Sequence, residues 1–516
     1  MTLIVADEAP AGPHPASAAE EWPRLVSDVD VCVCVIGAGV AGLTAALTLA
    51  RAGRSVAVLE AGRLGGGASA VNAGIVLPGY ANLDGVVARV GLPSAKALWS
   101  LSVEGERAIR ATVSAAAMRP AGHLFVQRRN DAAKLRARAD WLREIFGAEV
   151  AFRSADDVRA LLPSSAYFQG LHWPDALNLV PDLYLRDLAA AAAAAGARIF
   201  TQSAALGIDA DGLRKRVDTA AARVRAADIV VAAGAKLGAL LPRAARAGLT
   251  LEIGLVETES LPPQMQAAFR FAGAVSEAGV CHQLVGGALV WSGAATTRNT
   301  GTPALARRLR AEIGQTYPLL RGLALRRTAS ASVTTTVHRM PHVGPLAPGI
   351  WLGAGFGRIG LANAAMGGLL IARAIAEGDD RWRLLEPFGL VSAGGRAGRL
   401  FAEAALRARR AAVQIRSLMA RLRAAPAPVP AIVEDHAPEA AAAAAPKAGQ
   451  PARKKPATPR KRAPRKPKIP APAEVVAVDR RPAAGRAGKG SGPRKRRTAP
   501  AKPKDEVAPV PPERLH

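Results

Sequence analysis

The chain has 516 residues, half of them apolar, which is enough for two or three domains with a large core. Its net charge of +28 is uneven, because residues 446–516 hold 21 Lys and Arg against 5 Asp and Glu. Three cysteines exclude a disulfide framework, and the lack of an apolar run of about 18 residues argues against a membrane-spanning helix.

The first part of the chain alternates strand and helix. The acidic stretch over residues 1–27 predicts a flexible leader without a signal peptide, and therefore a cytoplasmic protein. Residues 29–36 (VDVCVCVI) predict a buried strand, residues 40–52 a small-residue helix, and residues 55–60 a second strand. Residues 62–85 are rich in Gly, Ala and Asn and indicate an ordered loop region.

The rest of the chain continues with less regular patterns. Further elements are expected in this order: mainly helix over 94–162 with a strand at 123–127, a helix over 183–195, strands at 197–202 and 227–235, an antiparallel sheet over 250–300, a strand, glycine turn and helix within 342–379, and an Arg-rich helix over 396–424.

A glycine-rich turn joins the first predicted strand and helix. Gly37, Gly39 and Gly42 form the pattern G-x-G-x-x-G, in which the first glycine permits a tight turn, the second lets a pyrophosphate approach the backbone, and the third lets helix and strand pack closely. Glu60 follows at the end of the second strand, near the spacing expected for the residue that binds ribose hydroxyls. This context predicts an adenine dinucleotide site.

The residues after Glu60 indicate which of two dinucleotides, NAD or FAD, the site binds. An NAD domain normally continues with further strands and helices, whereas here the loop GRLGGGASAVNAGIV (62–76) follows. A long loop of small residues suits a backbone wrapped around an extended, buried cofactor, which favours FAD over NAD.

Three blocks now resemble the D-amino-acid oxidase family of FAD-dependent oxidoreductases, which includes glycine and sarcosine oxidases and, with the greatest likeness, gamma-glutamylputrescine oxidase. They are VIGAGVAGLTAALTLARAGRSVAVLEAGRLGGGASAVNAG, then ALNLVPDLYLRDLAAAAAAAGARIFTQSAALGI with ADIVVAAGAKLGALLP, and finally HRMPHVGPLAPGIWLGAGFGRIGLANAAMGGLLIARAIAEG. Their order and spacing cover residues 29–390.

The resemblance implies a fold of α/β class, α+β overall, in which a Rossmann-like FAD-binding domain is interleaved with an antiparallel-sheet substrate domain. The domain boundaries expected from it are an oxidoreductase over 28–390, with FAD-binding parts at 28–85, 180–242 and 335–380 and substrate parts at 86–179 and 243–334, followed by a helix at 391–425 and a disordered basic tail at 426–516.

The resemblance also implies a non-covalently bound FAD and the residues that hold it. Carried onto this chain, the cofactor-binding residues are Gly37, Ala38, Gly39, Val40, Ala41, Gly42, Glu60, Ala61, Arg63, Gly67, Ala68, Ser69, Asn72, Gly74, Ala205, Ala232, Ala233, Gly234, Gly355, Gly357, Arg358, Ile359 and Gly360. In the family the helix after the last glycines starts at the flavin ring, where its dipole stabilises negative charge.

The chain departs from the family where substrate contacts are expected. The usual G-A-S-G-R-N-G-G is GASAVNAG here, and the usual S-G-H-G is GRIG, so the resemblance implies that Arg358 lies beside the flavin. Arg358 is a candidate to hold the flavin carbonyl edge or a substrate carboxylate, or is simply solvated. His282 is a second substrate candidate, with a structural role as the alternative. No catalytic residue and no metal cluster stand out.

The predicted function is oxidation of the C–N bond of an amine or amino acid, with hydride transfer to flavin N5 and reoxidation by oxygen or an electron carrier. The departures leave open an alternative, a non-catalytic flavoprotein that binds a polyanion. The tail interleaves Lys and Arg with Pro, Ala and Gly, which predicts a disordered segment that binds nucleic acid or another polyanion, or merely aids solubility.

Overall fold

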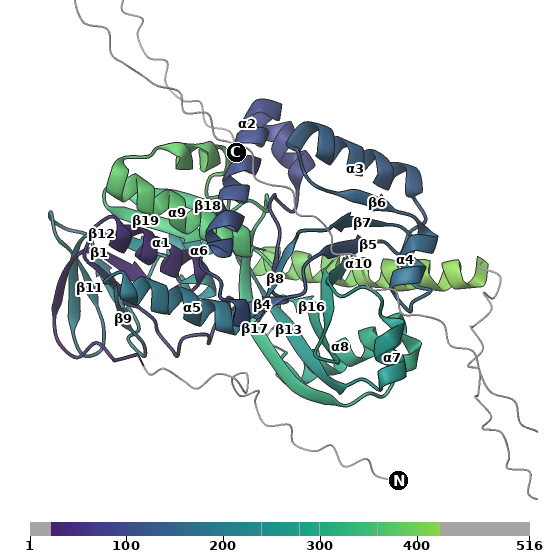
Figure 1. Cartoon of the computed structure of the whole chain (residues 1–516). Coiled ribbons are helices and arrows are strands. Elements are labelled where there is room, and N and C mark those ends of the chain that lie inside the picture. Colours follow the sequence, from purple (N-terminus) through teal and green to yellow (C-terminus); the bar gives the residue numbers. More distant parts are fainter. Residues whose placement is uncertain (1–21, 239, 278, 299, 359, 424–516) are drawn as a thin grey trace, which may run out of the picture. The chain divides into compact units, whose positions relative to one another are not determined.

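The computed structural model describes residues 22–423 apart from residues 239, 278, 299 and 359. Most of the expected leader and the expected basic tail lie outside these residues. Within them, the chain forms two large β-sheets, one small sheet and a set of helices that pack on the sheets (Figure 1).

The first sheet contains the predicted nucleotide-binding strands. Its members are β1 (Val29–Ile36), β2 (Val56–Leu59), β9 (Arg198–Phe200), β10 (Gly207–Asp209), β11 (Lys215–Asp218), β12 (Arg223–Val231), β18 (His342–Ala347) and β19 (Ile350–Ala354). The main path runs β10-β11-β12-β1-β2-β9, and β19 also pairs with β12. β1 is parallel to β2 and β12, and β12 is parallel to β19, so the core is the Rossmann-like arrangement that the sequence predicts.

Helices with small residues pack closely beside this sheet. They are α1 (Val40–Arg51), α2 (Leu83–Arg110), α5 (Pro181–Ala194) and α9 (Leu361–Glu377). A Cβ on Gly368 of α9 would lie 2.4 Å from the carbonyl oxygen of Ala41 in α1, and one on Gly105 of α2 would lie 2.0 Å from that of Ala362. Glycine at these crossings lets α9 approach both neighbours, so the middle of α9 is held close to the start of α1.

The second sheet has the order β17-β13-β16-β15-β14-β5-β7-β6. Its strands are β5 (His123–Val126), β6 (Ala151–Arg153), β7 (Gly170–Trp173), β13 (Gly248–Ser260), β14 (Ala274–Glu277), β15 (Val280–Val285), β16 (Ala288–Thr296) and β17 (Leu325–Thr336). All pairs are antiparallel except β14 with β5, which is parallel. The expected antiparallel sheet is therefore mixed, because two separate chain segments join side by side at this pair.

Strands of the two sheets alternate along the chain, which is the interleaving expected. A small third sheet, β3 (Ile75–Val76), β8 (Leu177–Leu179) and β4 (Met118–Arg119), joins the loop after β2 to the segment before β5. The remaining helical segments are η1 (Ala115–Ala117), α3 (Ala132–Phe146), α4 (Ala155–Leu161), η2 (Gly234–Lys236), α6 (Pro242–Ala247), α7 (Pro263–Ala268), α8 (Thr302–Thr316), η3 (Pro318–Leu320), η4 (Arg381–Phe388) and α10 (Gly395–Arg423).

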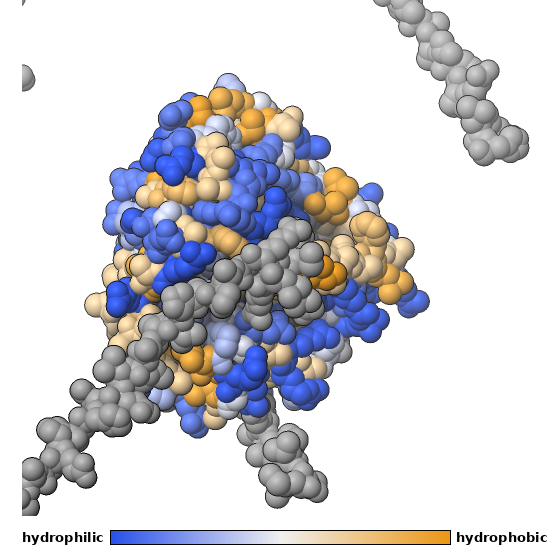
Figure 2. All heavy atoms as spheres, turned by 90° about the vertical axis from the view of Figure 1, so that its right-hand side faces the viewer, coloured by the Kyte–Doolittle hydropathy of each residue, from blue (hydrophilic) through white to orange (hydrophobic). Residues whose placement is uncertain are grey.

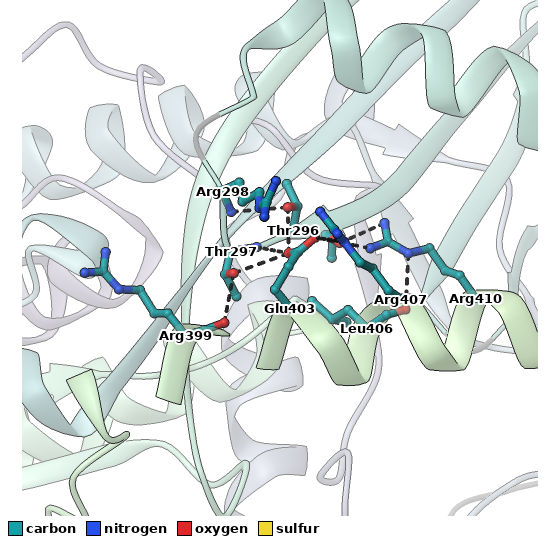
Figure 3. A network of polar contacts seen from close by, with 9 residues as sticks. Thr296, Thr297, Arg298, Arg399, Glu403, Leu406, Arg407 and Arg410 are labelled. Carbon is teal, nitrogen blue, oxygen red and sulfur yellow. Dashed lines mark hydrogen bonds and ion pairs between the residues drawn. The ribbon is translucent and has the colours of Figure 1, made fainter. Parts of the chain in front are cut away.

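The Arg-rich helix expected at 396–424 is α10, and a buried carboxylate ties it to the second sheet. Glu403 accepts hydrogen bonds from the Thr296 hydroxyl at 2.8 Å and the Thr297 N–H at 2.9 Å, at the end of β16 (Figure 3). Arg407 and Arg410 lie 3.1 and 3.6 Å from its other oxygen. The helix is therefore anchored through one acidic side chain surrounded by donors.

The surface near the far end of α10 is mainly hydrophilic, with separate hydrophobic patches (Figure 2). Apolar atoms commonly make up more than half of a soluble protein's surface, so separate patches are ordinary. No helix of the described residues has the length and apolar character needed to cross a membrane.

Candidate functional site

The turn between β1 and α1 excludes side chains from a space beside the helix start. Gly37 has φ +106°, and a Cβ there would lie 2.5 Å from the carbonyl oxygen of Ala232. A Cβ on Gly42 would lie 1.9 Å from the carbonyl oxygen of Gly37. Gly39 caps α1 without a side-chain hydrogen bond. The first N–H groups of the helix thus face a glycine-lined turn, where they and the helix dipole favour an anion.

Glu60 stands directly after β2, beside this turn. Its Oε2 accepts a hydrogen bond from the Ala38 N–H at 3.0 Å, and its Oε1 accepts one from the Gly62 N–H at 3.0 Å. The side chain is half-buried. An ionised carboxylate offers only acceptors, and ribose hydroxyls are donors that it can bind.

The loop over 62–76 is fixed to the helix start and to the third sheet. Ser69 Oγ accepts from the Val40 N–H at 3.2 Å, and the Asn72 amide donates to the Ser69 carbonyl at 2.8 Å. The Gly74 N–H donates to Asn72 Oδ1 at 2.8 Å, and a Cβ on Gly74 would lie 1.9 Å from the Leu179 carbonyl oxygen. The loop is therefore ordered, as the sequence predicts.

The remaining predicted cofactor residues of this region differ in exposure. Val40 and Ala41 are buried in α1, and Ala68 is half-buried. Ala61, Arg63 and Gly67 are exposed.

The segment after β12 returns to the glycine turn. The Ala232 N–H donates to the Ile36 carbonyl at 2.8 Å, and Gly234 has φ +55°. Ala205 and Ala233 are half-buried and pack on the core beside β12. Gly234 also lines a cavity of about 90 Å³ whose other walls include Thr336 and Gly355.

The glycine-rich segment before α9 touches the second sheet. Gly355 and Gly357 have φ +77° and +75°, and Gly360 precedes the first residue of α9. The Gly357 N–H donates to the Thr334 carbonyl of β17 at 3.1 Å. Ile359 lies outside the described residues. The start of α9 is therefore held between the two large sheets.

Arg358 extends from this segment to the second sheet. Its Nη1 lies 3.0 Å from the place a Cβ on Gly279 would occupy, and its Nε is shielded from solvent without a hydrogen-bond partner. Burial lowers the pKa of Arg358, while the neighbouring Cys281 and Glu312 act in the opposite direction. A partly desolvated guanidinium with an unused donor is suited to bind an anion.

His282 points to the opposite face of the second sheet, so the structure does not bring it together with Arg358. Its Nε2 lies 2.7 Å from the Tyr317 hydroxyl, and its ring stacks on Trp291 with centroids 4.3 Å apart. Burial lowers its pKa to about 3. The preceding Cys281 instead packs against Ile75, because successive side chains of a strand alternate between faces. His282 is buried in the core against Tyr317 and Trp291, which favours the structural role that the sequence left open as the alternative.

The sequence did not point to three charged residues near the loop over 62–76. Arg119, Glu257 and Arg327 line a small cavity together with Ala70 and Asn72. They come from β4, β13 and β17, and no motif or periodicity connects segments so far apart in the chain.

The described residues fit a dinucleotide that begins at the α1 turn. Two tight backbone contacts that leave no room for a Cβ, at Gly37 and Gly42, shape the turn beside the Glu60 carboxylate, which could accept hydrogen bonds from ribose hydroxyls. Residues 32–374 match the sequence model of the family described as "FAD dependent oxidoreductase". The chain belongs to this family of FAD-dependent oxidoreductases. FAD is therefore its cofactor.

Two curated relatives of the FAD-dependent oxidoreductase resemble it over most of their length. The probable oxidoreductase OrdL of Haemophilus influenzae is 26% identical over 395 residues, which cover 73% of this chain and 90% of the relative. Gamma-glutamylputrescine oxidoreductase of Escherichia coli is 25% identical over 374 residues, which cover 70% and 87%.

Solved structures show the same fold. Glycine oxidase from Bacillus cereus is 20% identical and superimposes with a TM-score of 0.57, covering 69% of this chain and 97% of that one. The L-amino acid deaminase from Proteus vulgaris with a deleted insertion gives a TM-score of 0.59 at 18% identity, covering 73% and 98%. These likenesses establish the architecture of this FAD-dependent oxidoreductase.

Proposed function

We propose that the chain oxidises the C–N bond of an amine or amino acid. The observation that carries this is the convergence of three segments: the loop around Ile75, the glycine segment of Arg358, and the second sheet at Cys281. Relatives that share this sequence or fold include a gamma-glutamylputrescine oxidoreductase and a glycine oxidase. Both names give a nitrogen-containing compound as the substrate.

FAD, when bound, would supply at its N5 an acceptor for a hydride from the α-carbon of a neutral amine. The residues of the chain would provide position and charge. The glycine turn and the start of α1 would bind the pyrophosphate, and Glu60 the ribose. The start of α9 would favour negative charge beside it through its dipole. Arg358 would hold an anionic edge of the cofactor or a substrate carboxylate, and oxygen or an electron carrier would take the electrons onward.

An absorbance spectrum of the purified protein tests this proposal first. Flavin bands at roughly 370 and 450 nm are expected, and they should bleach without oxygen when one amine of a panel of amines and amino acids is added. Bands that no member of the panel bleaches would favour the non-catalytic alternative. Protein that shows no bands even after FAD is added would contradict the site itself.

The role of Arg358 is tested separately. The Arg358→Met variant should lose at least about tenfold in kcat/KM for the substrate found in the panel, since a charged hydrogen bond contributes about 1.5–3 kcal/mol. Full FAD content in this variant would assign Arg358 to the substrate, and reduced FAD content would assign it to the cofactor. Arg358→Lys should recover part of this loss. Arg383→Met, in which an exposed arginine is changed, serves as the control. Unchanged kinetics in Arg358→Met would remove this residue from the site.

We propose, independently, that residues 446–516 bind a polyanion. Their 21 Lys and Arg against 5 Asp and Glu support it. Binding of duplex DNA should weaken steeply as salt rises, because phosphate contacts release counterions, and should vanish when residues 446–516 are deleted.

A further inference from the structure

One face of α10 presents apolar side chains to solvent. Six exposed residues make up this outer face: Leu400, Phe401, Ala404, Ala408, Ala411 and Ile415. Apart from Phe401, they follow one another at spacings of three or four residues, so they share one side of the helix. Leu400 is 68% exposed, Phe401 78% and Ile415 62%. Glu403 lies on the side of α10 that contacts the end of β16 (Figure 3).

Exposed apolar side chains are concentrated in this part of the molecule. Among the described residues, twelve large apolar side chains are exposed, and five of them lie between residues 390 and 415. These five are Leu390, Val391, Leu400, Phe401 and Ile415. Single exposed apolar residues are ordinary, whereas several on one helix and the segment before it indicate a surface that another molecule covers.

Almost every charged residue of α10 is positive. The helix contains eight arginines and one acidic residue, Glu403, which is only 4% exposed and pairs with Arg407. At about 100° per residue, Arg396 and Arg407 border the outer face on one side, and Arg409 borders it on the other. All three arginines are exposed. The apolar face is therefore flanked by positive charge along both edges.

We propose that the outer face of α10 binds the surface of an anionic lipid bilayer. A helix with this pattern lies in the plane of the interface, with its apolar residues among the upper acyl chains. The long side chains of the flanking arginines would reach the phosphates of the lipid headgroups. Residues 446–516, with 21 Lys and Arg against 5 Asp and Glu, would be attracted to the same surface. The proposal is independent of the proposed oxidation.

An anionic bilayer suits this face better than other occupants do. A second copy of the chain would bring the arginines of its own α10 close to those of the first, and like charges repel. Duplex DNA offers phosphates but no hydrocarbon for Leu400 and Phe401. An anionic bilayer supplies both negative charge and hydrocarbon, which matches both parts of the surface.

Co-sedimentation of the full-length protein with lipid vesicles tests the proposal. The wild type should bind vesicles of mixed phosphatidylcholine and phosphatidylglycerol at least about tenfold more tightly than vesicles of phosphatidylcholine alone. Leu400→Ser combined with Phe401→Ser should weaken binding to the anionic vesicles roughly ten- to hundredfold. Leu206→Ser combined with Leu213→Ser is the matched control and should bind as the wild type does, since these leucines are 60% and 94% exposed but lie outside α10.

Two further measurements separate contact with the lipid from damage to the fold. Both double variants should unfold at the wild-type midpoint, because the replaced side chains are exposed, so lost binding is not lost folding. In Phe401→Trp, lipids with brominated acyl chains should quench the fluorescence of the added tryptophan. In Leu213→Trp they should leave the added tryptophan unquenched.

Three results would overturn the proposal. One is equal binding of the wild type to anionic and neutral vesicles. Another is anionic-vesicle binding that survives unchanged in Leu400→Ser with Phe401→Ser, which would assign the binding to residues 446–516 alone. The third is self-association of the lipid-free wild type, measured by sedimentation velocity, that the same double variant abolishes, which would assign the outer face to a second copy of the chain.

Discussion

The two large sheets of this molecule differ in the chemical groups found around them. Around the first sheet, the site is built from backbone: glycines at 37 and 42 whose missing side chains make room for backbone atoms, and N–H groups at a helix start. The second sheet and the strands beside it instead carry buried ionisable side chains, including the ion pair Arg128–Glu277 and Arg119, whose Nε and Nη1 have no hydrogen-bond partner.

This difference separates two tasks. A dinucleotide has the same phosphates in every enzyme that uses it, so a fixed backbone shape can bind it. A substrate is recognised by its own charges and hydrogen bonds, which depend on particular side chains held in low dielectric. We therefore expect substitutions that add side-chain atoms to destabilise the region around the first sheet. Substitutions that remove a charged side chain should destabilise the second sheet.

The largest expected effect is the loss of Arg128 from the second sheet. Its Nε lies 2.7 Å from both oxygens of Glu277, and both side chains are at most 15% exposed. Arg128→Met leaves Glu277 buried without its partner and should lower the free energy of unfolding by about 3–5 kcal/mol, measured by urea denaturation.

The double variant Arg128→Met with Glu277→Gln is the control and should recover much of this stability. Burial already raises the pKa of Glu277, and losing Arg128 should raise it further, since the arginine lowers it. The single variant should therefore be less damaged at pH 5 than at pH 8, where the carboxylate is charged. Equal damage at both pH values would contradict an unpaired charge as the cause.

A smaller effect is expected from an added side chain at the first sheet. In Gly42→Ala the new Cβ would lie 1.9 Å from the Gly37 carbonyl oxygen, so the turn must open. A loss of about 1–3 kcal/mol in unfolding free energy is expected, together with much weaker FAD binding measured by flavin fluorescence. Gly207→Ala, where no atom lies within 4 Å of the new Cβ, should change neither quantity.

Loss of the Glu403 charge should mainly lower the local stability of α10. Burial acts to raise the pKa of this carboxyl, but donation from Thr297, Thr296 and Arg407 outweighs it and lowers the pKa to about 2. Because this pKa is depressed, the stabilisation that the charged Glu403 gives to α10 is fully present above roughly pH 4.3. It is lost as the pH falls toward 2.

Glu403→Gln should reproduce that loss at neutral pH. Faster hydrogen exchange is expected in α10, at a cost of about 1–2 kcal/mol, while the two sheets stay protected. Glu144→Gln, which changes an exposed residue of α3, should leave exchange unaltered. Protection of α10 that survives in Glu403→Gln would show that other contacts anchor it.

The smallest effect is expected at His282. Because burial lowers its pKa to about 3, the unfolded chain takes up a proton below about pH 6.5 while the folded chain does not, and stability falls as the pH drops. His282→Gln should lose about 1 kcal/mol at pH 7 with the loss of the contact to Tyr317, and should show a shallower decline between pH 7 and pH 5. Turnover should be unchanged, and a large loss of kcat would restore His282 as a substrate contact.

Local chain geometry explains which parts of the candidate site could be predicted from the sequence alone. The turn of Gly37, Gly39 and Gly42 and the carboxylate of Glu60 lie within one strand–helix–strand unit, so their spacing along the chain already sets their spacing in space. The same holds for the helix start after Gly360. The cofactor side of the site can therefore be predicted from such short-range relations. The family resemblance added the order in which these segments follow one another along the chain.

The substrate side depends on contacts between distant segments. The parallel pairing of β5 with β14, the orientation of His282 toward Tyr317, and the meeting of Arg119 with Arg327 each join residues far apart in the chain. No periodicity in a single segment encodes such a meeting, because a side chain's surroundings are set by which strands become neighbours and in which register. Strand register, more than residue type, decides which of these charges are left without a partner in the folded chain.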